Sequence, residues 1–282
     1  NIGDMTNTGV ELDLHYTPIK RKDLVWTINL NMTHYKNRIT YLPDEKKTLE
    51  VDGYHGYMNG SRFYGQDLPI NTWYLRRFAG LSSEGLSQWY YKDKTTGEKK
   101  TTTTYSEADY YLCGDPNPDL YGGFGTSLSF RGFDFSAQLS YTIGGKAIDY
   151  GYSNLMSNPT AANASGFNIH KDVLDAWSPE NTGSKTPRWY FNDLNTGSIS
   201  DRFMIDGSYL NLQNIQLGYT VPDNLTKRLG GVRNLRLYVS CDNVYYWTKR
   251  KGFDPRNSTT GVGATRSVSP YRTYSAGLSL QF

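Results

Sequence analysis

The chain has 282 residues, with 30 Lys or Arg against 27 Asp or Glu, and a formal net charge of +3. Charges of both signs are spread along the sequence, which argues against a nucleic-acid-binding surface. Mean hydropathy is −0.63, and no stretch approaches the run of about 18 apolar residues that a membrane helix needs. A transmembrane barrel would escape that test, because only every second residue of its strands faces lipid.

The two cysteines lie in different surroundings. Cys113 sits in a segment rich in Pro and Asp, whereas Cys241 falls on the apolar face of a predicted strand, so no disulfide is expected between them. The sequence opens at Asn1 without an initiator methionine or a signal segment. We therefore expect either a processed chain or a piece of a longer protein.

Two strand-like runs come first. Apolar residues occupy every second position over 10–16 and again over 26–32, with polar residues between them. A short polar connection at 18–23 separates the runs. This pattern predicts a β-hairpin.

The next segments have weaker patterns. Residues 36–69 are rich in Gly and Tyr without a sustained period, and we expect a long loop. Residues 71–79 and 85–91 are candidates for a third and fourth strand, although their periodicity is mixed. Residues 92–119 again read as a loop, since Pro116 and Pro118 oppose strand pairing.

The clearest hairpin spans 124–143 and turns at Gly132. One face is apolar throughout, and the other consists almost wholly of hydroxyl, amide and small residues. A soluble sandwich would normally place Lys and Glu on its outer face, whereas a barrel has a polar lumen and an apolar exterior. The connection that follows, over 144–203, is longer than compact soluble domains usually contain, but is ordinary for the extracellular side of an outer-membrane barrel.

Two more strands are predicted over 210–221 and 235–241. The alternation slips between Leu212 and Ile215, which predicts a β-bulge. A short link at 222–232 joins these strands, and a long loop over 249–270 precedes the last one.

The last strand, within 269–282, alternates to the final residue. Its apolar face holds Tyr274, Ala276, Leu278, Leu280 and Phe282. The ending, with Ser275, Gly277, Leu280 and Phe282, resembles the assembly signal by which bacterial outer-membrane barrels are recognised for insertion. An ordinary edge strand is the alternative interpretation.

These runs predict an all-β, antiparallel transmembrane β-barrel section of about nine strands with long extracellular loops. Short turns near 20, 82, 132 and 226 would lie on one side, together with the C-terminus, and long loops near 50, 105, 175 and 260 on the other. An odd strand number does not fit a complete bacterial barrel. We therefore expect residues 1–282 to be the C-terminal part of a larger barrel.

Short motifs recur in one order along almost the whole chain. They are NTGVEL at 7–12, KNRITYLP at 36–43, DAWSPEN at 175–181 with PR at 187–188, SDRF at 200–203, GSYL at 207–210, LGYTVP at 217–222, SCDN at 240–243, GFDP at 252–255 and the ending at 277–282. In this set the chain resembles the SusC-like TonB-dependent outer-membrane transporters of Bacteroidetes. It departs from their pattern at Asn211 and Gln213, where a basic residue is expected, and at 94–106, which looks like an insertion.

The resemblance implies a barrel of about 22 strands, with an N-terminal plug and a TonB box outside this chain. It also implies residence in the outer membrane, a SusD-like lid lipoprotein, energy relayed by TonB, no cofactor, and import of oligosaccharides (glycans). A peptide importer of the same family and a soluble all-β carbohydrate-binding module remain as alternatives.

Aromatic residues in two predicted loops are the candidate substrate contacts, because an aromatic face suits the C–H face of a sugar ring. They are Tyr54, Tyr57, Phe63, Tyr64, Trp177 and Trp189. Packing between loops, contact with the lid, or a place in the interfacial girdle is the alternative explanation, and it is the favoured one for Trp177 and Trp189. The four histidines are scattered, and the sequence offers neither a metal-type spacing nor a nucleophile elbow. We therefore expect that this protein is not an enzyme.

Overall fold

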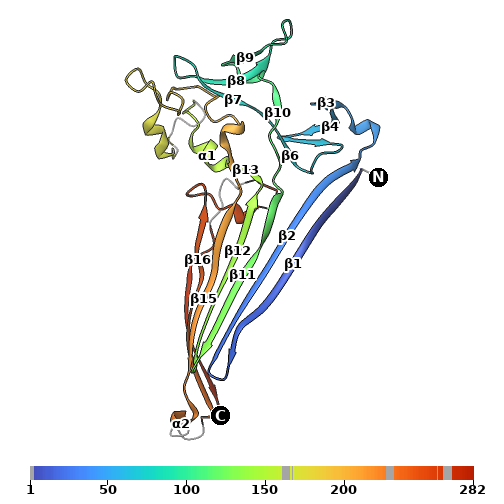
Figure 1. Ribbon diagram of the computed structural model, residues 1–282. Coiled ribbons are helices and arrows are strands. Elements are labelled where there is room, and N and C mark those ends of the chain that lie inside the picture. The colour runs from blue at the N-terminus through green and yellow to red at the C-terminus, as the bar shows by residue number, and fades with distance from the viewer. Residues whose placement is uncertain (1–2, 161–165, 167, 227–231, 259, 263–268) are drawn as a thin grey trace.

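A long antiparallel sheet forms the body of the protein in the computed structural model, which describes residues 3–160, 166, 168–226, 232–258, 260–262 and 269–282. Its seven strands follow one another in chain order, so every connection joins neighbours. They are β1 (Asp4–Arg21), β2 (Leu24–Tyr41), β11 (Pro118–Phe130), β12 (Phe133–Gly144), β15 (Tyr209–Thr220), β16 (Asn234–Thr248) and β17 (Thr273–Gln281). Figure 1 shows the sheet as a tall curved wall, with the C-terminus at one end and an assembly of loops and short strands at the other.

The predicted antiparallel all-β architecture is confirmed, but the strand count is corrected from about nine to seven in the main sheet. Residues 71–91 do form strands, namely β6 (Thr72–Arg76), β7 (Phe78–Leu81) and β8 (Ser87–Lys92). These strands belong to separate small sheets at the loop end. The turn near residue 82 therefore lies among the long loops rather than among the short turns.

Side chains of the main sheet separate into two faces by cross-strand register. One continuous row of directly paired residues crosses six strands: Leu14, Leu30, Phe124, Leu139, Leu212 and Tyr245. Further rows above and below it are equally apolar, and many of their side chains are exposed, such as Val10, Phe133 and Val239. An exposed apolar band on one face is what the lipid-facing side of a barrel requires.

The predicted bulge is present at Gln213. Gln138 pairs with Asn214 and Leu139 with Leu212, so Gln213 is the extra residue of β15. The register toward β16 also changes between Leu212 and Asn214, but there the extra residue belongs to β16, since Leu212 pairs with Tyr245 and Asn214 with Asp242. The apolar face stays continuous on both sides of the bulge because the strand changes phase there.

Short strands and helices make up the loop end, including segments expected to be loops at 36–69 and 92–119. A five-stranded sheet has the order β10-β6-β5-β4-β3, a three-stranded one β7-β8-β9, and β13 pairs with β14. The remaining strands are β3 (Leu49–Val51), β4 (Tyr54–Asn59), β5 (Arg62–Gly65), β9 (Lys99–Thr102), β10 (Tyr110–Leu112), β13 (Lys146–Ile148) and β14 (Met204–Asp206).

The helices are short. The α-helices are α1 (Tyr150–Leu155) and α2 (Asp223–Thr226), and 3-10 turns span Asp44–Lys46, Tyr105–Glu107, Lys171–Asp175, Asp201–Phe203 and Pro255–Asn257. Among the residues that the structure describes, no helix has the length and apolar character to cross a membrane.

Two hydrophobic clusters hold the loop end together. The larger contains Trp73, Leu75, Ile148, Met156, Val173 and Phe203. The smaller contains Val51, Phe63 and Tyr74. Burial at this end therefore comes from side chains that converge from many segments, whereas the sheet below is held by its backbone ladder.

The final strand pairs with β16 from Asp242–Thr273 to Asn234–Gln281. Gly277 lies opposite Tyr238, and a Cβ at Gly277 would come within 2.2 Å of the Tyr238 ring. Phe282, 75% exposed, follows the last paired residue, and Leu280 lies opposite Leu235. The assembly role of Ser275, Gly277, Leu280 and Phe282 stays a prediction.

Candidate functional site

The polar face of the main sheet is the first candidate surface. Two adjacent rows cross it: Asn31, Gly123, Ser140 and Asn211 in one, and Asn29, Gly125, Gln138, Asn214 and Asp242 in the other. These residues occupy the positions between the apolar ones, so the period of two places them all on one side. The result is a wall of amide and hydroxyl groups broken by glycines.

Some of these amides already make hydrogen bonds within the protein. Asn31 accepts a hydrogen bond from the backbone N–H of Gly123 at 2.8 Å. Asn214 Nδ2 donates to Asp242 Oδ1 at 2.7 Å. Such contacts fix the orientation of part of the wall, which is the condition for presenting polar groups to a ligand with little loss of entropy.

A groove of about 450 Å³ lies along this wall and includes Asn31, Gly123, Gly125, Gln138 and Gln213 in its lining. Tyr121 and Tyr209 also line it. A second hollow, of about 760 Å³, adjoins it toward the loop end and shares Tyr121. Its lining includes Asn7, Asn37 and Asn117, and Tyr35 donates to Asn117 Oδ1 at 3.4 Å. Polar hollows thus extend from the sheet toward the loops.

Nearer the short turns, the polar face carries an ion pair. Arg236 on β16 reaches Asp134 on β12 across the intervening strand β15. Their side chains pass over Gly218, where a Cβ would lie 2.4 Å from Asp134 Oδ2 and 2.6 Å from Arg236 Nη2. The pair neutralises two charges on the polar face.

The first group of predicted aromatic contacts divides between a surface pair and the core. Tyr57 and Tyr64 stack with their ring centroids 5.2 Å apart and 14° between planes, and Lys46 lies 5.2 Å from the Tyr57 ring. Tyr54 packs against the smaller cluster. Phe63 is a correction: it is fully buried within that cluster, so it supports the loop and does not contact a ligand from outside.

The second group lies around the DAWSPEN motif. Trp177 packs against Gly85, where a Cβ would lie 2.4 Å from the indole, and its backbone N–H donates to Thr186 O at 2.8 Å. Trp177 therefore joins the motif to the β7–β8 hairpin. Trp189 is 39% exposed and begins a short stretch of exposed apolar residues that includes Tyr190 and Phe191.

A buried arginine ties these loops to the top of the sheet. The Arg62 guanidinium lies 3.1 Å from the centroid of the Trp73 ring and donates to the backbone oxygens of Asn71 and Thr260. Burial lowers the pKa of Arg62 to about 10. Asn71 and Thr260 lie far apart in the sequence, so Arg62 connects two separate loops.

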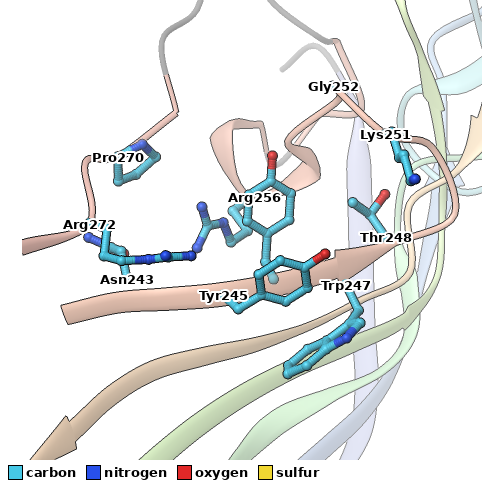
Figure 2. A pocket seen from close by; sticks show the side chains of 10 residues that line it. Asn243, Tyr245, Trp247, Thr248, Lys251, Gly252, Arg256, Pro270 and Arg272 are labelled. Carbon is cyan, nitrogen blue, oxygen red and sulfur yellow. The ribbon is translucent and has the colours of Figure 1, made fainter. Parts of the chain in front are cut away.

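At the rim, the loop after β16 folds back over the polar face. Arg256 is held by Asp254, at 2.7 and 2.8 Å, and donates to Asn211 Oδ1 at 2.8 Å. A hollow of about 500 Å³ forms beside these residues, and Figure 2 shows Arg256 on one side of β16 with Trp247 on the other. A basic residue was expected at position 211, and Asn211 stands there instead. The positive charge beside it comes from Arg256 in the loop.

No cluster of three or more His, Cys, Asp or Glu that could hold a metal ion occurs among the residues that the structure describes. Cys113 and Cys241 are both free cysteines.

Sequence reasoning missed the groove itself. Its floor consists of Gly123 and Gly125, and glycines carry no side-chain signal for a site. The available signal was three glycines, at 122, 123 and 125, around the start of the predicted strand at 124, because glycine in a strand often marks close approach of another group.

Known proteins were compared by sequence and by structure. No family model matches the chain. TonB-dependent receptor P3 of Formosa agariphila is 28% identical over 100% of this chain and 29% of its own length. TonB-dependent receptor SusC of Bacteroides thetaiotaomicron is 27% identical over 100% of this chain and 27% of its own.

Among solved structures, a chain of the RagAB peptide transporter superposes with a TM-score of 0.82 and 26% identity, covering 100% of this chain and 30% of that one. This chain therefore spans less than a third of the length of these relatives. The relatives in sequence are TonB-dependent receptors, and the structural one is a peptide transporter. Over its full length the chain is similar to the SusC-like TonB-dependent transporters, and its seven-stranded antiparallel sheet matches part of their β-barrel.

Proposed function

We propose that the protein takes part in TonB-dependent import of oligosaccharides across the outer membrane. The observation that carries this proposal is the polar wall: rows of Asn, Gln, Ser and Gly cross the sheet opposite the exposed apolar face. A wall with these two faces suits a lumen that offers hydrogen bonds to an uncharged, hydroxyl-rich cargo. In this proposal residues 1–282 form the C-terminal part of the barrel, and the plug and earlier strands belong to the rest of the protein.

A SusD-like surface lipoprotein is the proposed lid. Exposed apolar residues concentrate at 189–194 in the loop end, namely Trp189, Tyr190, Phe191 and Leu194. Long loops of outer-membrane barrels face the outside, where a lid would meet this patch. Trp189 therefore serves the lid in preference to a sugar, while Tyr57 and Tyr64 remain candidate sugar contacts.

Uptake assays test the proposal. Cells that depend on this transporter should accumulate a neutral oligosaccharide only when the transporter, the lid and TonB are all intact. Uptake that persists without TonB would contradict the mechanism.

Peptide import is the second candidate, supported by the likeness to the RagAB peptide transporter. It predicts that the same cells take up short peptides and that oligosaccharides do not compete. Calorimetry of the lid protein against both ligand classes separates the two.

A further inference from the structure

The groove on the polar wall has a floor made of glycines. Gly123 and Gly125 form it, on β11. A Cβ at Gly125 would lie 2.6 Å from Gln138 Oε1, and one at Gly123 would lie 3.3 Å from Asn31 Nδ2. Glycines weaken a strand interior, so their presence here indicates that the space above the backbone is used.

The neighbouring Gly122 has a different explanation. It belongs to the opposite face, where a Cβ would lie 2.8 Å from the Tyr141 hydroxyl, and Tyr141 donates to Asn31 O at 3.2 Å. That contact accounts for one glycine of the three. The Gln138 side chain lies over Gly125 in the same way. Gly123 is left with open space above its backbone, because the nearest atom to its Cβ would lie 3.3 Å away.

Amides surround this floor with free hydrogen-bonding capacity. Within the described chain, the Gln138 and Gln213 side chains make no hydrogen bond, and Asn31 uses its oxygen for Gly123 while its Nδ2 stays available. Gln213 is the bulge residue of β15, and a bulge redirects a side chain away from the regular alternation. Each amide offers a donor and an acceptor side by side, which matches neighbouring hydroxyls on a ring.

Aromatic rings stand at the groove as well. Tyr121, 39% exposed, is held edge-on by Tyr35, with centroids 6.1 Å apart and an interplanar angle of 84°. A T-shaped contact with one ring leaves at least one face of Tyr121 clear of Tyr35, and such a face suits the C–H surface of a pyranose. Among the residues that the structure describes, the groove lining contains no charged side chain that would compensate a phosphate, a uronate or a peptide terminus.

We propose that this groove, formed by Gly123, Gly125, Gln138, Gln213 and Tyr121, is a subsite for one uncharged sugar ring of the cargo. The proposal rests on the oligosaccharide-import function above and deepens it. The ring lies on the glycine floor, its hydroxyls bond to the amides, and Tyr121 covers one side.

Binding and uptake by the full-length transporter with its lid test this subsite. The probes are neutral oligosaccharides of glucose, mannose and xylose, with uncharged peptides of similar size as a second set. Gln213→Leu removes one of the amides proposed to bind the sugar. Gln216→Leu is the matched control, because Gln216 lies on the same strand, β15, but outside the groove, where it pairs with Ser136 and Ser240. Gly125→Ala is an independent variant that displaces the Gln138 amide, because the new Cβ would lie 2.6 Å from Gln138 Oε1.

We expect Gln213→Leu to weaken binding of the recognised oligosaccharide about 3- to 10-fold, the value of one hydrogen bond, with Gln216→Leu within about twofold of wild type. Gly125→Ala should weaken it as well, at unchanged outer-membrane levels. Equal effects of Gln213→Leu and Gln216→Leu, or no effect of Gln213→Leu and Gly125→Ala, overturn the subsite while import stands. Sensitivity of peptide binding alone assigns the groove to peptide and overturns the sugar proposal. If the wild-type transporter binds no oligosaccharide, both the subsite and the proposed function fail.

Discussion

Arg236 donates two hydrogen bonds to Asp134, Nε to Oδ2 at 3.0 Å and Nη2 to Oδ1 at 2.5 Å, although a complete strand lies between them. The contact is possible only because β15 has no side chain at Gly218. Two-point pairing between a guanidinium and a carboxylate is the strongest geometry for such groups.

Gly218→Ala should therefore destabilise the barrel through the ion pair. A Cβ there forces both side chains aside, and we expect a loss of about 1 kcal/mol, because the pair is still partly exposed. The measurement is urea unfolding in lipid vesicles. In a variant that already carries Asp134→Ser and Arg236→Gln, Gly218→Ala should not lower the free energy of unfolding further. An undiminished loss of about 1 kcal/mol in that variant would contradict the explanation. Gly183→Ala, with nothing within 4 Å of its Cβ, is the control.

Deletion of Phe282 should impair membrane assembly more than ligand binding. Phe282 is exposed just beyond the last paired residue of β17 and contributes little to packing within the sheet. We expect several-fold less transporter in the outer membrane, with unchanged affinity per assembled molecule. Phe282→Tyr should assemble normally. Normal insertion of the truncated form would count against the assembly signal.

Substitution of Arg62 should loosen the loop end without unfolding the sheet. Arg62→Met loses the contact with Trp73 and leaves the carbonyls of Asn71 and Thr260 without their donor. The local cost should be about 2–3 kcal/mol, visible as faster hydrogen exchange over 69–75. Arg38→Met is the control, since Arg38 is exposed and pairs with Asp67. Equal exchange in the two variants would refute the role of Arg62.

Acid should weaken the attachment of the loop after β16. Burial alone would raise the pKa of Asp206, but hydrogen bonds from Lys249 and Ser208 outweigh it and lower the pKa to about 2. Because the ordinary value is about 3.9, this carboxylate stabilises the fold above about pH 4 and loses that effect as the pH falls toward 2.

The difference in melting temperature between wild type and Asp206→Asn should accordingly shrink over that pH range. Asp44→Asn, which removes an exposed carboxylate paired with Lys47, should show no such trend. A difference that is constant with pH would indicate that Asp206 acts through its shape and not its charge.

The two faces of the sheet could be predicted from the sequence because lipid enforces a strict alternation. Leu14, Leu30 and Phe124 share a row in the structure as their spacing indicates. The bulge at Gln213 was also predictable, since only an extra residue restores the apolar phase after Leu212.

The upper part of β2 was missed for a physical reason. Above the apolar band the pattern inverts: Asn37 and Ile39 are buried on the polar side, and Lys36 and Arg38 are exposed on the other. A strand that leaves lipid and passes beneath a cap of loops changes which face is hidden. A search for a single apolar face therefore ends too early.

The strand count was wrong because short strands at the loop end share the composition of barrel strands. Residues 72–76 are a buried run with Trp73 and Leu75 in the larger cluster. Their assignment depends on contacts with Ile148 and Phe203, far along the chain, which no local pattern contains.

The loop end carries its own cores, and this has a consequence for recognition. The clusters around Trp73 and around Phe63 join segments that lie far apart in this chain, and Arg62 and Trp177 connect further loops to them. Under the proposed import function, these clusters would order the loop end before cargo arrives. A loop end that is already ordered loses little binding energy to ordering, which favours rapid capture and rapid release over tight retention.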